Sequence, residues 1–258
     1  MRALILAAGR GSRMQHLSDE RPKCLVELAG RPLLERQVAA LRGAGIGEIG
    51  VVRGYRAEML AFPGLSYFDN ARWAETNMVA SLAAASEWLR TGPVIVSYAD
   101  IFYRSALVRS LGGVAGDLVI TYDRAWRRLW TQRFADPLAD AETFRTNDAG
   151  ELLEIGGRTR SIDEIQGQYM GLLKFTPVAW RAVEALRASL EATLRDRLDM
   201  TGLLRRLLAA RTVGIHTLGT DGQWGEVDNP GDVALYEAML ARGELRLEPA
   251  TGLRSDAS

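Results

Sequence analysis

Residues 2–13 read RALILAAGRGSR, an apolar run that stops at a glycine-rich turn. The run from Arg2 to Leu6 is short and apolar after its first residue, which is typical of a strand covered on both faces of a sheet. Glycine allows the backbone to turn tightly and to approach a ligand with its N–H groups, which suit phosphate oxygens. The stretch therefore predicts a buried strand that leads straight into a phosphate-binding turn.

Two basic residues follow this turn. Arg13 offers a planar guanidinium fork for anions, and Lys23 lies in the segment RPKCL, where Pro22 stiffens the backbone. A surface turn with solvated charges is the alternative, because a bare Gly-x-Gly is weak evidence. The common phosphate motifs fit poorly. A dinucleotide-binding pattern needs a glycine where the chain has Met14, and the Gly-Lys-Ser/Thr end of a P-loop is missing.

The rest of the first half alternates short apolar runs with stretches in which apolar residues recur at helical spacing. The expected strands are Arg2–Leu6, Glu48–Arg53, Pro93–Ser97 and Asp117–Tyr122, and the expected helices are Pro32–Arg42, Met78–Arg90 and Arg104–Leu111. Such alternation favours a three-layer α/β fold, in which a mostly parallel mixed sheet carries helices on both faces.

Beyond residue 123 the pattern loosens. The expected strands are Glu142–Arg145, Leu152–Ile155, Gln168–Phe175 and Val213–Thr217, and the expected helices are Pro177–Leu194, Met200–Ala210 and Gly231–Arg242. No repeat and no low-complexity linker divides the chain, so we predict a single domain over residues 1–247. Residues 248–258 lack periodicity, and we expect them to form a flexible tail.

Composition narrows the class of partner. Lys and Arg number 32 and Asp and Glu number 32, so the chain has no general basic field for gripping nucleic acid. No apolar run approaches the roughly 18 residues that a membrane-spanning helix needs. Cys24 is the only cysteine, which excludes a disulfide within the chain. We expect a cytoplasmic protein that binds neither nucleic acid nor a membrane, and a homodimer is compatible with the sequence.

Two aspartates follow strand-like runs. Asp100 ends the apolar run PVIVSYAD, and Asp228 lies in WGEVDNPGD, just before an expected helix. Ligands of open α/β sheets sit beyond the carboxyl ends of the strands, and Mg²⁺ prefers hard oxygen ligands beside substrate phosphates. A magnesium site is one interpretation. The alternative for Asp228 is a simple helix N-cap.

The sequence resembles a known enzyme family. Residues 6–13, LAAGRGSR, followed by PKCL at 22–25 and GRPLL at 30–34, are similar to the signature of nucleotidyltransferases that make nucleotide-activated sugars and alcohols. The resemblance implies transfer of a nucleotidyl group from an NTP to a phosphorylated acceptor, with release of pyrophosphate. It implies that Lys23 and Arg13 are catalytic, and that Asp100 and Asp228 coordinate Mg²⁺.

The resemblance also implies a nucleotide site in residues 1–122 and an acceptor site mainly in residues 123–247. The stretch ETNMVASL at 75–82 looks like a turn and helix start of phosphocholine cytidylyltransferase-like members, although Thr76 or Asn77 could equally cap a helix. The expected nucleotide-binding residues are Leu6, Ala7, Ala8, Gly9, Gly11, Ser12, Arg13, Lys23, Asn77, Ser81 and Tyr98.

Aromatic and acidic residues gather in the second half. Amines are bound by aromatic faces together with carboxylates, whereas buried tryptophans more often fill a core. Segments 130–134, 141–144 and 167–171 resemble the phosphocholine and aminoalkylphosphonate cytidylyltransferase branch. The expected acceptor-binding residues are Asp123, Trp126, Trp130, Glu142 and Tyr169.

These residues favour CTP as the donor, and phosphocholine or 2-aminoethylphosphonate as the acceptor. Three alternatives stay open: a sugar-1-phosphate nucleotidyltransferase that uses UTP, dTTP or GTP, a glycosyltransferase, and a non-catalytic nucleotide-binding regulator. A glycosyltransferase normally carries Asp-x-Asp, but the residue two after Asp100 is Phe102.

Overall fold

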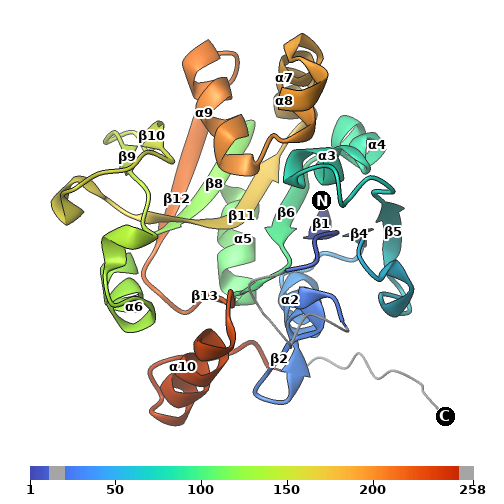
Figure 1. Ribbon diagram of the computed structural model, residues 1–258. Coiled ribbons are helices and arrows are strands. Elements are labelled where there is room, and N and C mark those ends of the chain that lie inside the picture. The colour runs from blue at the N-terminus through green and yellow to red at the C-terminus, as the bar shows by residue number, and fades with distance from the viewer. Residues whose placement is uncertain (12–20, 250–258) are drawn as a thin grey trace.

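The computed structural model describes residues 1–11 and 21–249 and arranges them around a seven-stranded sheet (Figure 1). The strand order is β12-β8-β11-β6-β1-β4-β5. The strands are β1 (Arg2–Ala7), β4 (Ile49–Arg53), β5 (Ser66–Asp69), β6 (Val94–Tyr98), β8 (Leu118–Asp123), β11 (Gln168–Phe175) and β12 (Ile215–Thr220). Neighbouring strands are parallel except around β11, which runs antiparallel to both β6 and β8. The predicted mostly parallel mixed sheet is confirmed.

Helices cover both faces of this sheet. Alternate residues of a strand point to opposite faces, so the side chains of β1 enter two different hydrophobic cores. Ala3, Ile5 and Ala7 belong to one cluster of buried side chains, and Leu4 and Leu6 belong to the other. The first cluster includes side chains of α2 (Leu33–Gly43), α5 (Ser105–Gly113), α6 (Trp126–Arg133) and α10 (Pro230–Ala241). The second includes side chains of α3 (Met78–Ala83), α4 (Ser86–Thr91), α7 (Pro177–Ser189) and α9 (Met200–Ala210).

Two predicted helices are each broken into two. The helix expected over Met78–Arg90 is split into α3 and α4, and at the break the Ser86 hydroxyl donates to the Ala83 carbonyl over 2.6 Å. The helix expected over Pro177–Leu194 ends with α7, because Leu190 is extended, and resumes as α8 (Ala192–Asp196). A serine hydroxyl can donate to a backbone carbonyl in place of a helical N–H. The spacing of apolar residues does not reveal such a contact. Helix α6 and strand β5 are further elements that the periodicity did not predict.

The described residues also form short strand pairs and 3₁₀ turns outside the main sheet. Three two-stranded pairs are β2 (Glu27–Leu28) with β3 (Arg31–Pro32), β9 (Phe144–Thr146) with β10 (Leu152–Ile155), and β7 (Ile101–Phe102) with β13 (Gly225–Glu226). Single 3₁₀ turns are η2 (Lys23–Leu25), η3 (Ala57–Met59), η4 (Pro137–Ala139) and η5 (Ile162–Glu164). Among the described residues, no helix is long and apolar enough to span a membrane.

The end of the described chain packs back onto the fold. The Glu248 carboxylate accepts a hydrogen bond from the Ser105 backbone N–H over 2.8 Å, at the first turn of α5, where Arg104 offers no side-chain cap. The contact fixes Glu248, the first residue of the predicted flexible tail. Residues 250–258, the rest of that predicted tail, lie outside the described residues.

Candidate active site

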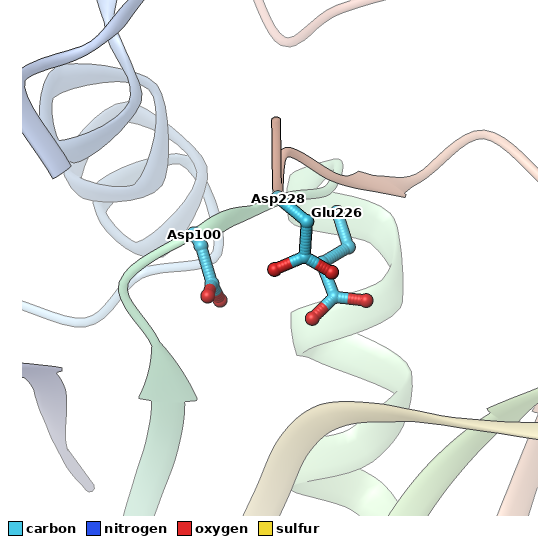
Figure 2. A group of neighbouring side chains, drawn as sticks. All are labelled: Asp100, Glu226 and Asp228. Carbon is cyan, nitrogen blue, oxygen red and sulfur yellow. The ribbon is translucent and has the colours of Figure 1, made fainter. Parts of the chain in front are cut away.

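Three carboxylates converge where β6 ends. Asp100 follows β6, and Glu226 and Asp228 belong to the segment around β13. Strand β13 pairs antiparallel with β7, so Glu226 faces Ile101, and the Val227 N–H donates to the Asp100 carbonyl over 2.9 Å. One carboxylate oxygen from each of the three residues lies within 4.8 Å of the other two (Figure 2). The β7–β13 pair thus joins two acidic segments that are far apart in the sequence.

Lys23 lies against this cluster. Its ammonium donates to Asp100 Oδ2 over 2.7 Å and to Asp228 Oδ1 over 2.8 Å, and its side chain is 10% exposed. Burial by itself would lower the pKa of Lys23, but the two aspartates outweigh it and raise that pKa. Lys23 is therefore a fixed positive charge between the two aspartates.

Glu226 completes the cluster and was not among the predicted ligands. Removal from bulk water and the neighbouring charges of Asp100 and Asp228 raise the pKa of Glu226 to about 8, against the opposing effect of Arg133 and Lys23. The sequence held a signal for it, because residues two apart on a short strand point to the same side. The segment Glu226-Val227-Asp228 therefore carried two candidate ligands.

Arg133 supports the cluster from α6, with a fully buried side chain. Its Nε donates to Asp232 Oδ1 over 3.0 Å, and its Nη2 donates to Asp228 Oδ2 over 3.4 Å. Its Nη1 lies 3.6 Å from Glu226 Oε2. Asp232 in turn accepts from the Asp228 N–H over 2.8 Å. Arg133 and Asp232 thus fix the orientation of Asp228, a role that sequence spacing alone did not reveal.

The cluster fits a hard divalent cation. Asp100 Oδ1 is buried and has no hydrogen-bond partner among the described residues, so one carboxylate oxygen is left over for a ligand. Mg²⁺ is commonly held by one or two carboxylates together with substrate phosphates and water. The donor set of Asp100, Asp228 and Glu226 matches that preference.

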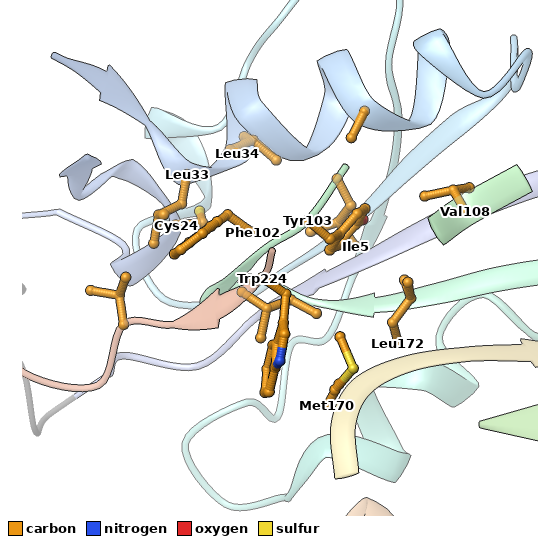
Figure 3. Close-up of a cluster of buried hydrophobic side chains, with 14 of the residues drawn as sticks. Ile5, Cys24, Leu33, Leu34, Phe102, Tyr103, Val108, Met170, Leu172 and Trp224 are labelled. Carbon is orange, nitrogen blue, oxygen red and sulfur yellow. The ribbon is translucent and has the colours of Figure 1, made fainter. Parts of the chain in front are cut away.

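The neighbouring thiol plays a structural part. Cys24 belongs to the buried hydrophobic cluster that also contains Phe102 and Trp224 (Figure 3). Burial raises the pKa of the Cys24 thiol to about 12, so the thiol stays protonated at neutral pH. Cys24 and Phe102 directly follow Lys23 and Ile101 in the chain, and their burial anchors both segments of the site.

A first pocket of about 210 Å³ opens beside Lys23 and Asp100. Gly11, with φ of +72°, packs on the Lys23 stem so closely that a Cβ there would lie 2.7 Å from Lys23 Cβ. The glycine therefore lets the turn after β1 lie directly on Lys23. The pocket is lined by Leu6, Ala7, Ala8, Gly9, Gly11, Lys23, Cys24, Trp73, Thr76, Asn77, Met78, Ser81, Tyr98, Ala99 and Asp100.

The predicted nucleotide-binding residues gather around this pocket. Leu6, Ala7, Ala8, Gly9, Gly11, Lys23, Asn77, Ser81 and Tyr98 all line it. Ser12 and Arg13, which were predicted with them, lie outside the described residues. Trp73, Thr76 and Met78 also line it, although they were not among the predicted site residues.

The capping alternatives have different outcomes. Asn77 is the N-cap of α3, since its side chain accepts from the Met78 N–H over 2.7 Å, and it lines the pocket as well. Asp228 is not an N-cap, so that alternative is wrong. Asn229 caps α10 instead and forms a capping box with Asp232. The Asp228 carboxylate is thereby left to join Asp100 and Glu226 in the cluster.

A second pocket of about 260 Å³ shares Tyr98 with the first. Tyr98 belongs to both pockets, and Glu226 and Asp228 line the second one. The two pockets therefore meet at the carboxylate cluster. The second is lined by Tyr98, Trp130, Asp140, Glu142, Thr143, Phe144, Ile155, Gln168, Tyr169, Met170, Gly171, Thr201, Glu226 and Asp228.

The Gln168 side chain fixes the backbone of Glu142 at the second pocket. The Gln168 side chain accepts from the Glu142 N–H over 3.1 Å and donates to the Glu142 carbonyl over 2.7 Å. The Trp130 indole N–H donates to Asp140 over 3.1 Å, which places a second carboxylate on the same wall. The second pocket therefore combines aromatic faces with fixed carboxylates.

The structure separates the predicted acceptor residues into two groups. Trp130, Glu142 and Tyr169 line the second pocket, whereas Asp123 and Trp126 do not. Buried Asp123 accepts from the Trp224 indole over 2.8 Å and from the Ala125 and Gly222 N–H groups. Buried Trp126 donates to the Ile165 carbonyl over 3.3 Å. Those two residues organise loops and core rather than the pocket wall.

Comparison with known proteins adds to this geometry. The family model for a MobA-like NTP transferase domain matches residues 3–215. A CTP:phosphoglutamine cytidylyltransferase from Campylobacter jejuni is 34% identical over 253 residues, covering 90% of this chain and 98% of the relative. A 2-aminoethylphosphonate cytidylyltransferase from Lancefieldella rimae is 26% identical over 241 residues, covering 91% of each chain. The solved CTP:phosphocholine cytidylyltransferase of Streptococcus pneumoniae superposes with a TM-score of 0.70 at 20% identity, covering 93% of this chain and 98% of that one, a likeness of fold.

Proposed function

The chain belongs to the MobA-like NTP transferase family and is a nucleotidyltransferase, and we propose that it transfers CMP from CTP to a small amine-bearing phosphate or phosphonate in the cytoplasm. Pyrophosphate is the second product. The observation that carries the proposal is the meeting of two pockets at one charged centre, Lys23 with Asp100, Glu226 and Asp228. That arrangement provides separate places for a donor and an acceptor, with the reacting phosphates between them.

The reaction needs no nucleophilic side chain. A phosphate or phosphonate oxygen of the acceptor attacks the α-phosphorus of CTP in line, and the bond to pyrophosphate breaks on the opposite side. Positioning and charge neutralisation carry most of such a transfer. Lys23 stabilises negative charge at the α-phosphate, and the backbone around Gly9 and Gly11 holds the phosphates. Arg13 is proposed to hold the leaving pyrophosphate.

A magnesium ion is the proposed cofactor. Asp100 and Asp228 would hold it, with Glu226 within reach, because these carboxylates converge and one Asp100 oxygen has no protein partner among the described residues. A bound Mg²⁺ supplies Lewis-acid stabilisation of phosphate oxygens. Arg133 and Asp232 keep Asp228 oriented toward the centre.

The second pocket supports an amine in the acceptor. Trp130 and Tyr169 offer aromatic faces, and Glu142 and Asp140 offer carboxylates, the combination that binds ammonium groups. Burial raises the pKa of Glu142, and Arg158 opposes that rise, so the carboxylate benefits from a cationic partner. The relatives act on phosphoglutamine and on 2-aminoethylphosphonate, which supports a small phosphorus-bearing acceptor here.

A pyrophosphate-release screen tests the proposal. It crosses CTP, UTP, ATP and GTP with phosphoglutamine, phosphocholine, 2-aminoethylphosphonate and glucose 1-phosphate, with and without Mg²⁺. We expect release with CTP and an amine-bearing acceptor, and none without the metal. Preferred use of glucose 1-phosphate with UTP would overturn the acceptor assignment in favour of a sugar-1-phosphate nucleotidyltransferase.

A further inference from the structure

The side chain of Asn70 organises one wall of the first pocket without lining it. Asn70 directly follows β5 and is 9% exposed. Its amide Nδ2 donates to the Thr76 hydroxyl and to the Ser81 hydroxyl, each over 3.0 Å. Both of those residues line the pocket. One buried amide therefore contacts the hydroxyl groups of two residues that line the pocket.

The orientation of this amide follows from its third hydrogen bond. Asn70 Oδ1 accepts from the Arg72 backbone N–H over 3.0 Å. A backbone N–H can only donate, so the oxygen of the amide must point to Arg72 and the nitrogen to the hydroxyls. Thr76 and Ser81 are thereby both acceptors toward Asn70, and each must send its own proton elsewhere.

The two hydroxyl protons go to different places. Thr76 donates to the Arg72 carbonyl over 2.8 Å. For the Ser81 proton, no acceptor exists among the described residues, although the Ser81 residue is only 6% exposed. Asn70 occupies one lone pair of this hydroxyl, and its proton, which has no acceptor among the described residues, is available to donate. The open direction for Ser81 is the pocket.

The distribution of charge in the first pocket indicates that the wall around Ser81 suits the base rather than the phosphates. Among the described residues that line the first pocket, Lys23 alone carries a positive charge, and it lies with Gly9 and Gly11 near the carboxylate centre. The wall around Ser81 carries Trp73, Thr76 and Met78, which are uncharged. A triphosphate takes the Lys23 side, and this leaves the Ser81 wall for the ring.

We propose that Asn70 is a positioning residue that turns the Ser81 proton toward the base, and that this donor selects cytosine over uracil. The inference rests on the proposed nucleotidyl transfer from CTP. At ring position 3, cytosine presents an unprotonated nitrogen that accepts, whereas uracil presents an N–H that donates. A donor fixed in the protein pairs with cytosine and opposes uracil, and a mispaired buried donor is costly.

Asn70→Asp tests the inference by inverting the polarity. A carboxylate only accepts, so Ser81 would donate to the carboxylate introduced by the substitution and turn its own lone pairs to the base. We expect the ratio of the UTP and CTP dissociation constants to fall by roughly tenfold to a hundredfold, the scale of one or two hydrogen bonds. Isothermal titration with each nucleotide and Mg²⁺ measures this ratio without any acceptor. The added negative charge repels both triphosphates equally and cancels in the ratio.

Two further variants separate polarity from structure. Ser81→Ala removes the donor, so the ratio should move toward one without favouring UTP. Ser86→Ala is the control, because it removes a serine hydroxyl from the next helix at a position that does not line the first pocket. We expect Ser86→Ala to keep the wild-type ratio. In steady state, Asn70→Asp should raise KM for CTP more than it lowers kcat.

The outcomes distinguish this inference from the proposed function. A wild-type protein that binds CTP in preference to UTP, with a ratio unchanged in both Asn70→Asp and Ser81→Ala, would overturn the role of Asn70 and leave the function standing. A ratio shifted equally by Ser86→Ala would show that any loss of a nearby hydroxyl changes the ratio, and would overturn the specific role of Asn70 and Ser81. A wild-type protein that releases pyrophosphate from no nucleotide would overturn the proposed function itself.

Discussion

The two pockets of this protein meet at one charged centre but are built in different ways. The first is assembled from four stretches of the first hundred residues: the end of β1 with the turn after it, the residues around Lys23, the segment 73–81 and the end of β6. The second draws on the end of β6, α6, β9 and the loop before it, β10, β11, α9 and the segment around β13. Among the described lining residues, the first pocket carries a lysine, whereas the second carries four carboxylates and no basic side chain. The first pocket therefore draws only on the first hundred residues, whereas the second depends on tertiary packing of segments from both halves of the chain.

The largest effect is expected at the centre that both pockets share. Asp228→Ala should reduce kcat by at least roughly a thousandfold, because a carboxylate shared with the metal contributes several kcal/mol to the transition state. CTP binding by titration should change far less, since the first pocket keeps its glycine turn and Lys23. Asp221→Ala, at an exposed aspartate paired with Arg124, is the control. Near-normal kcat of Asp228→Ala at saturating Mg²⁺ would show that the metal assignment is wrong.

Lys23→Ala examines the first pocket alone. We expect kcat to fall by roughly a hundredfold, the scale seen when one preorganised charge donor is lost. KM for CTP should rise less, because the backbone N–H groups still hold the phosphates. Arg21→Ala removes an exposed charge from the same segment and should leave both constants close to wild type. A change confined to KM in Lys23→Ala would reduce Lys23 to ground-state binding.

Glu142→Gln examines the second pocket alone. The change keeps the shape of the side chain and removes its charge, so KM for an amine-bearing acceptor should rise by roughly tenfold while KM for CTP stays constant. Glu154→Gln alters a carboxylate of the adjacent hairpin that does not line this pocket, and serves as the control. Equal rises in both KM values would mean that the two pockets are not separate sites.

The smallest effect is expected where neither pocket is touched. Glu248→Ala removes the carboxylate that caps α5 and should cost about 1 kcal/mol, a fall in Tm of roughly 2–4 °C. Thermal unfolding followed by circular dichroism measures the shift. Both KM values and kcat should stay at their wild-type levels. A kinetic change without a change in Tm would contradict a purely structural role for this contact.

The same difference explains what could be predicted from the sequence. Much of the first pocket follows from a contiguous signature and from strand ends, and every predicted nucleotide-binding residue that the structure describes lines it. Asp123 and Trp126 have the residue types of an amine site, but their partners are loop N–H groups, an indole and a carbonyl. Nothing in local spacing reveals which side of a helix or loop will face a pocket formed by segments that are far apart in the sequence.

Arg133 shows the same limit at the centre. Its position in α6 depends on a helix whose apolar residues did not stand out as periodic, and its partners Asp228 and Asp232 come from the far end of the sequence. Only packing of α6 against the segment before α10 creates the contact. The breaks between α3 and α4, and between α7 and α8, are likewise decided by hydroxyl contacts and extended residues rather than by apolar spacing.

The β7–β13 pair has a consequence for the order of events during synthesis. A ribosome delivers the chain from its N-terminus, so β1, β4, β5 and β6 emerge while β13 is still unmade. β8 then has no neighbour in the sheet until β11 arrives, because it pairs only with β11 and β12. A nascent chain can thus assemble the glycine turn and Lys23 long before Asp228 joins Asp100. The carboxylate cluster is therefore completed late in synthesis, when β13 pairs with β7.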